Sequence, residues 1–294
     1  MKRCSLLALW LVLLIAAAAP AWAAAPGPSV GVWAGAKLTA LLNPAAAARW
    51  GLEPGGQFAV LDDGRVVLLT RNGEFFDLGD GRQLPAQAPL GVSAFTADGP
   101  LLITVREDRL GWYEQGVVQE SLRLPQAGLG IVAGPGQRLY LFGPRGQGSA
   151  IHLLEDGRAA LLVDLPQGAI SALAVSGERL FFAVGGEIYT LAKGERPALL
   201  FLAAGQPRIL SLAADPFSGM LYFATADAVY AMRAGVAVSI LKGLGGVLRH
   251  AGGALYVLDP KRKTLVKLQG LEKLVGLTGK TGVGSGPAPG QFKE

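Results

Sequence analysis

Cysteine, histidine and asparagine are nearly missing from this 294-residue sequence, which contains one cysteine, two histidines and two asparagines. The single cysteine, Cys4, lies in an N-terminal segment that we expect to be removed, so the mature chain would have no disulfide and no thiolate. These residue types supply many metal ligands, acid–base groups and nucleophiles. Their scarcity predicts a protein that is not an enzyme, binds no metal and needs no cofactor.

Charge is sparse as well, at 17% of residues. The formal net charge is +5, and it falls to +3 without Lys2 and Arg3. Nucleic-acid-binding proteins usually carry a dense basic stripe with aromatic residues among the cations, and no such stripe is present in the sequence. We therefore expect no nucleic-acid partner.

The N-terminus has the pattern of a secretory signal peptide over residues 1–23. Two basic residues precede an apolar run at 6–19, and Ala-Trp-Ala at 21–23 has the small-x-small pattern of a cleavage site. Cleavage after Ala23 is predicted, which gives a periplasmic or secreted protein. The apolar run is shorter than the roughly 20 residues of a transmembrane helix, so we expect no stable membrane span after cleavage. An uncleaved anchor is the alternative.

One phrase occurs six times along the chain: a small turn, two or three bulky apolar residues, a polar break and a second apolar strand. The steps between its occurrences are 35, 38, 41, 41 and 34 residues. A period of this length, built from short strands and turns, is typical of β-propeller blades. The phrase begins at Val66, Leu101, Leu139, Leu180, Leu221 and Leu255.

Each repeat reads as four short antiparallel strands, which predicts an all-β, six-bladed propeller. In the fourth repeat we expect strands at 170–175, 180–184, 187–191 and 198–202, separated by glycine-containing turns. Residues 24–277 would form this single domain, with repeats near 57–88, 89–125, 126–166, 167–205, 206–244 and 245–277.

The segments that flank the repeats are harder to place. Residues 30–42 are partly strand-like, and we predict that they complete the last blade as an added strand. The alanine-rich stretch at 44–50 forms a short helix or lines the first blade. Residues 278–294 are rich in glycine and proline, and we expect a flexible tail that packs against the ring closure or hangs free.

The repeated turn-apolar-aromatic phrase resembles NHL and SMP-30-type six-bladed propellers over about residues 38–277. The glycine-rich stretch at 279–292 is similar to the link that precedes a blade in NHL proteins, and Leu42-Asn43-Pro44 resembles the opening of the next blade. The sequence lacks the Asp-x-x-Asn-x-Arg-Ile segment of strong NHL repeats. The SMP-30-type resemblance implies a channel metal held by glutamate, asparagine and aspartate, but no position matches those ligands, and Asn72 lies in a hairpin turn.

Two polar side chains are candidates for the central channel. Aligning Gly252 with Gly177 places Arg249 and His250 on the innermost strand of the last repeat. His152 takes a position that favours packing between blades. The sequence shows no partner that would make His250 a general base, so we assign no catalytic residue. The alternative to a non-catalytic protein is an SMP-30-type or lyase-type hydrolytic enzyme, or a small-ligand binder, with its site in the channel.

The remaining candidates are cations in the loops that join second to third strands and outer to inner strands. These loops share one face of a propeller, and their cations outnumber their acids. This pattern predicts a mildly basic surface for a protein partner, acidic in character, or for a polyanionic glycan; the alternative is that loops are charged because they are solvated. The leading prediction is an exported interaction scaffold that binds through Arg71, Arg106, Arg109, Arg145, Arg208, Lys261 and Arg262.

Overall fold

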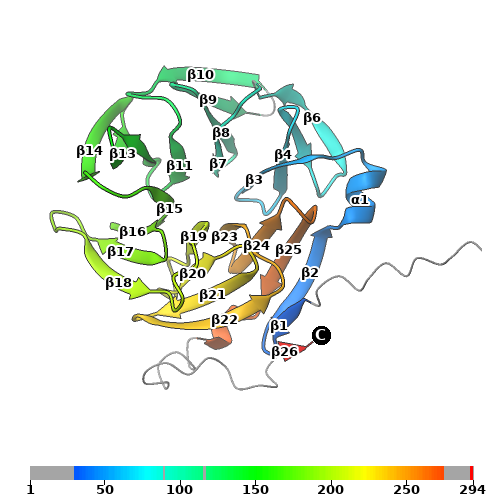
Figure 1. The fold of residues 1–294 in the computed structure, drawn as a ribbon. Helices are drawn as coiled ribbons and strands as arrows, with labels where there is room; N and C mark the ends of the chain where they lie inside the picture. The colour runs from blue at the N-terminus through cyan, green and yellow to red at the C-terminus, as the bar shows by residue number, and fades with distance from the viewer. Residues whose placement is uncertain (1–29, 89, 115–116, 275–291, 294) are drawn as a thin grey trace, which may run out of the picture.

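The computed structural model describes residues 30–88, 90–114, 117–274 and 292–293. They form six antiparallel sheets arranged around a central axis, so the chain is an all-β, six-bladed propeller (Figure 1). The predicted signal peptide at 1–23 lies outside the described residues. No helix in the described part of the chain has both the length and the hydropathy that a membrane crossing requires.

The first three blades follow one another along the chain, each with its first strand nearest the axis (Figure 1). Their strands are β3 (Pro54–Val60), β4 (Val66–Thr70), β5 (Glu74–Asp77) and β6 (Arg82–Gln87); β7 (Ala94–Asp98), β8 (Leu101–Arg106), β9 (Arg109–Glu114) and β10 (Val117–Arg123); and β11 (Gly130–Ala133), β12 (Leu139–Arg145), β13 (Gly148–Glu155) and β14 (Arg158–Leu165).

The last three blades complete the ring. Their strands are β15 (Ile170–Ser176), β16 (Arg179–Val184), β17 (Glu187–Leu191) and β18 (Ala198–Leu202); β19 (Ser211–Ala214), β20 (Leu221–Ala224), β21 (Ala228–Arg233) and β22 (Val236–Lys242); and β23 (Val247–Ala251), β24 (Ala254–Asp259) and β25 (Thr264–Gln269), followed by the 3-10 helix η1 (Leu271–Leu274). The fourth blade agrees with the predicted strands to within one residue, because its glycine turns close local hairpins.

The N-terminal segment closes the ring and corrects one prediction. β2 (Lys37–Leu42) pairs antiparallel with β25 and is the outermost strand of the sixth blade. β1 (Gly31–Trp33) pairs instead with β22 of the fifth blade, so residues 30–42 do not form one added strand. The turn between them, in which the Ala36 amide donates to the Trp33 carbonyl, moves the chain from one blade to the next.

Two further short elements lie next to the N-terminal strands, one after β2 and one beside β1. Helix α1 (Pro44–Arg49) follows β2 and resolves the alternatives for 44–50 in favour of a helix. The Asn43 side chain accepts a hydrogen bond from the Ala46 amide at 2.8 Å, which caps the helix. Pro44 occupies the first turn, where a backbone N–H would have no acceptor within the helix, so its missing N–H costs no hydrogen bond. Within the predicted tail, β26 (Phe292–Lys293) pairs with β1, and residues 278–291 and 294 lie outside the described residues.

The core lies between neighbouring blades. Phe58, Phe75, Phe182 and Tyr222 are among the largest side chains that are fully buried. Leu42, from β2, packs in one cluster with residues of the first and sixth blades. Because neither face of a single blade is covered by its own strands, burial of these side chains requires the assembled ring.

Candidate functional site

The antiparallel topology gives the ring two different ends. We call the end formed by the loops between second and third strands, together with the connections from each blade to the next, the hairpin face. The opposite end, formed by the loops between first and second strands, is the channel mouth. The sequence-predicted cations lie at the hairpin face, and the main channel pocket lies at the channel mouth.

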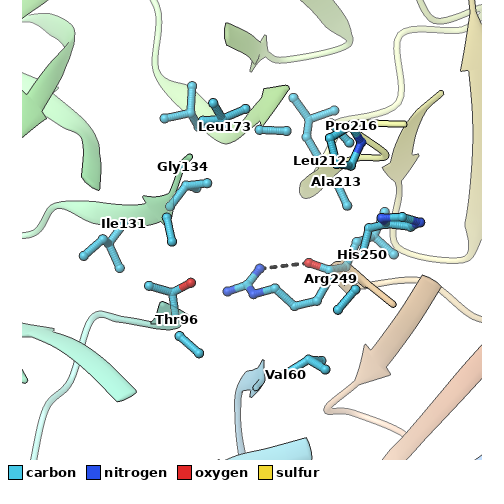
Figure 2. A pocket seen from close by; sticks show the side chains of 18 of the residues that line it. Val60, Thr96, Ile131, Gly134, Leu173, Leu212, Ala213, Pro216, Arg249 and His250 are labelled. Atoms are coloured by element: carbon cyan, nitrogen blue, oxygen red, sulfur yellow. Dashed lines mark hydrogen bonds between the residues drawn. The ribbon is translucent and has the colours of Figure 1, made fainter. Parts of the chain in front are cut away.

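The channel pocket has a volume of about 300 Å³ and is lined by all six innermost strands. Most of its wall is alanine, valine, leucine, glycine and proline, including Gly134 and Pro216 of the mouth loops. Thr96, Arg249 and His250 supply the polar side chains in Figure 2. The structure therefore brings the two predicted channel residues together, in a pocket with apolar walls.

Arg249 crosses this pocket toward Thr96 (Figure 2). Its Nη1 donates to the Leu248 carbonyl at 2.8 Å, and its Nη2 donates to the Phe95 carbonyl of β7 at 2.9 Å. The guanidinium carbon lies 5.8 Å from the centroid of the Phe58 ring, within cation–π range. Nε is buried and has no hydrogen-bond partner in the described part of the chain.

The charge of Arg249 has no carboxylate beside it. No acidic side chain in the ranges that the structure describes forms an ion pair with it. Burial lowers the pKa of Arg249 to about 10, and the side chain therefore stays cationic at neutral pH. The pocket contains one uncompensated positive charge.

His250 is positioned differently. Its side chain is 5% exposed and stacks on Tyr222, with ring centroids 5.7 Å apart. Its Nε2 lies 3.9 Å from Asp215 Oδ2, which is too far for a hydrogen bond. Asp215 instead accepts hydrogen bonds from the Phe217 amide and the Ser218 hydroxyl, and so holds the mouth loop. The pair does not have the geometry of an oriented acid–base dyad.

The predicted cations of the hairpin face are spread over several blades. Arg71, Arg106, Arg109, Arg145, Arg208 and Lys261 are exposed, and Arg262 is partly buried. Three of the seven form an ion pair with a carboxylate: Arg106 with Glu107 at 3.6 Å, Arg145 with Asp164 at 3.1 Å, and Arg262 with Asp259 at 3.0 Å.

The structure separates these seven cations from Arg249 and His250, which lie in the channel pocket. Among the described residues, no three His, Cys, Asp or Glu side chains lie close enough together to hold a metal ion. What the channel pocket offers chemically is a partly buried guanidinium in apolar surroundings.

Sequence reasoning missed the signal that makes Arg249 unusual. In each blade one residue of the innermost strand pairs with the second residue of the repeated phrase, and at this position the other five blades carry alanine or valine. A comparison of all six repeats at this single register would have shown that only the last one places a long cationic side chain there. The six residues are Ala59, Ala97, Val132, Ala174, Ala213 and Arg249.

The two histidines predict an acid-dependent loss of stability. Burial lowers the pKa of both His152 and His250, and the nearby Asp215 only partly opposes the effect at His250. Below the unfolded-state pKa of about 6.5 the unfolded chain binds protons more readily, so stability is lost as the pH falls from there toward the folded-state values. Urea unfolding should give a smaller free energy at about pH 5.5 than at about pH 7.5.

The matched control is the double variant His152→Gln, His250→Gln. Its free energy of unfolding should change less over the same pH interval, because most carboxylates titrate below it. An equally steep pH dependence in the double variant would contradict the assignment to these histidines.

No protein-family model matches this sequence, and no curated protein matches it. The solved structures that are similar in fold include the following three. A gluconolactonase from Xanthomonas campestris has a TM-score of 0.62 at 13% identity, over 81% of this chain and 91% of its own. Virginiamycin B lyase from Staphylococcus aureus has a TM-score of 0.55 at 13% identity, over 80% and 99%. The WD40 repeats of RRP9 have a TM-score of 0.55 at 13% identity, over 72% and 78%.

These similarities establish the propeller fold. They include two enzymes and one set of WD40 repeats, and at 13% identity they carry no activity over to this chain. The resemblance to NHL propellers stays a prediction.

Proposed function

We propose that this protein is an exported, non-catalytic propeller that acts as an interaction scaffold and binds an acidic protein or a polyanionic glycan at its hairpin face. Export to the periplasm or beyond rests on the signal pattern at residues 1–23. Binding at the hairpin face rests on the distribution of its cations. Loops on a rigid ring present side chains over a broad surface without disturbing the core.

The observation that carries the proposal is the exposure of cations from separate parts of the ring at this one end. Arg71 belongs to the first blade, Lys261 to the sixth, and Arg208 to the connection between the fourth and fifth. No ion pair holds these three side chains in the described part of the chain, so their charges are available to a partner. Electrostatic complementarity of this kind contributes mainly to association rate and specificity.

The test is a triple charge reversal, Arg71→Glu, Arg208→Glu and Lys261→Glu, in the mature protein. Arg262 is left in place because Asp259, its partner, is buried and would lose its compensation. We expect the variant to lose a partner that the wild-type protein captures from the exported fraction of the host. We also expect it to elute at a lower salt concentration from a heparin column, which serves as the polyanionic glycan probe.

A control variant carries the same charge change away from the hairpin face. Arg158, Arg179 and Lys193 are exposed and lie at the opposite end, in or beside loops of the third and fourth blades. Reversal of these three should leave capture intact. If both triple variants lose partner and heparin binding equally, only the overall charge matters and the proposal fails.

The alternative functions place the site in the channel: a hydrolytic enzyme of the SMP-30 or lyase type, or a binder of small ligands. One observation favours ligand binding there, namely the uncompensated Arg249 in an apolar pocket. A hydrolytic enzyme needs in addition a nucleophile or a base in reach of its substrate, and His250, stacked on Tyr222, has no oriented partner for that role.

A further inference from the structure

We propose that the channel pocket binds a small organic carboxylate, and that Arg249 is the residue that holds it. The inference is independent of the hairpin face, because the pocket opens at the other end of the ring. It rests on three observations: the register position of Arg249, the charge and hydrogen bonding of its guanidinium, and the apolar side chains of the pocket wall.

The register position shows that the pocket is built around this side chain. Five blades place alanine or valine where the sixth places Arg249, so small side chains surround one long one near the axis. A ring of small residues leaves open volume that protein interiors normally fill. Here the volume remains as a cavity of about 300 Å³, which is at the lower end of the range for small-molecule sites.

The guanidinium is charged, partly buried and incompletely hydrogen-bonded. Of its five N–H groups, two donate to the carbonyls of Leu248 and Phe95, and buried Nε has no partner in the described ranges. Burying a charge without a counter-ion is costly, and the Phe58 ring offsets only part of that cost. An anion in the pocket would supply the missing charge and could accept hydrogen bonds from the N–H groups of Nη1 and Nη2 that the two carbonyls leave unused.

The wall and the charge together select the class of anion. A single positive charge is balanced by a monoanion, whereas a phosphate dianion would leave a negative charge in apolar surroundings. Alanine, valine and leucine side chains around the guanidinium favour a ligand with an apolar body. The planar fork of the guanidinium matches a carboxylate, which can accept two parallel hydrogen bonds.

The test uses benzoate as the probe and benzamide, of the same size and neutral, as its control. Binding to the mature protein is followed by ligand-observed NMR and calorimetry. Benzoate should bind and benzamide should bind at least about tenfold more weakly, the difference that one charge-assisted hydrogen bond makes. Inorganic phosphate should compete poorly with benzoate.

Two variants at the same position separate binding from folding. Arg249→Met should lower benzoate affinity by roughly 10- to 100-fold. Without benzoate, its melting temperature should equal or exceed that of the wild type, because a partly buried charge with no ion-pair partner is removed. Arg249→Lys keeps the charge but loses the planar fork, and should keep part of the affinity.

Three results would overturn the proposal: equal binding of benzoate and benzamide, benzoate binding that survives Arg249→Met, or no binding of benzoate, butyrate or hexanoate to the wild-type protein. None of them bears on the hairpin face, whose own test uses cations at the other end of the ring.

Discussion

Replacement of Gly246 by alanine is expected to destabilise the fold by more than about 3 kcal/mol and to abolish benzoate binding. Gly246 has φ +115°, a conformation that residues with a Cβ rarely adopt, and an added Cβ would lie 2.4 Å from the Leu258 carbonyl oxygen. The residue directly precedes β23. A backbone shift that relieves this clash would therefore displace Arg249 and His250, which lie on that strand.

Gly252→Ala is the matched control for this substitution. Gly252 follows the same strand, also has positive φ at +55°, and would leave an added Cβ with no atom within 4 Å. We expect it to cost about 1 kcal/mol, the ordinary penalty for a left-handed alanine. Denaturant unfolding measures both variants, and equal losses would show that crowding at Gly246 does not matter.

Leu42→Ala is expected to cost about 2–5 kcal/mol, because it leaves a cavity at the point where the ring closes. Leu42 is 1% exposed, pairs with Leu265 of the sixth blade and packs with Phe58 of the first. β2 is held to the sixth blade by pairing and packing of this kind. Thermal and urea unfolding of the variant should show the loss in one cooperative transition.

Leu38→Ala supplies the control, since it makes the same chemical change on the same strand. Leu38 is 36% exposed, so its truncation should change stability by less than about 1 kcal/mol. If the two leucine variants were equally stable, β2 would not close the ring through the buried end of the strand.

The repeated phrase made the architecture predictable, because the strands and turns that it encodes form between residues close together in the sequence. In the fourth blade, glycine turns, β-branched and aromatic residues and their spacing place each strand next to its successor in sequence, and the hairpins have the predicted boundaries. The same alignment placed Arg249 and His250 on the innermost strand of the last repeat, which the register bears out.

Other features depend on contacts between distant segments, and the sequence reading missed or misplaced them. Residues 30–42 divide between two blades, because β1 pairs with β22 whereas β2 pairs with β25. The cations of the hairpin face were predicted as one set. Their ion pairs, such as Arg145 with Asp164, form between strands that only the folded blade brings together.

The sequence by itself therefore determined the number of blades, the order of strands within them and the position of Arg249 and His250 on an innermost strand. Only the tertiary structure decided which blades receive the N-terminal strands, and that Arg249 reaches the Phe95 carbonyl, 154 residues away in sequence. The physical reason is that strand pattern and turn chemistry act between neighbours along the chain. An uncompensated charge is apparent only when all six innermost strands surround it.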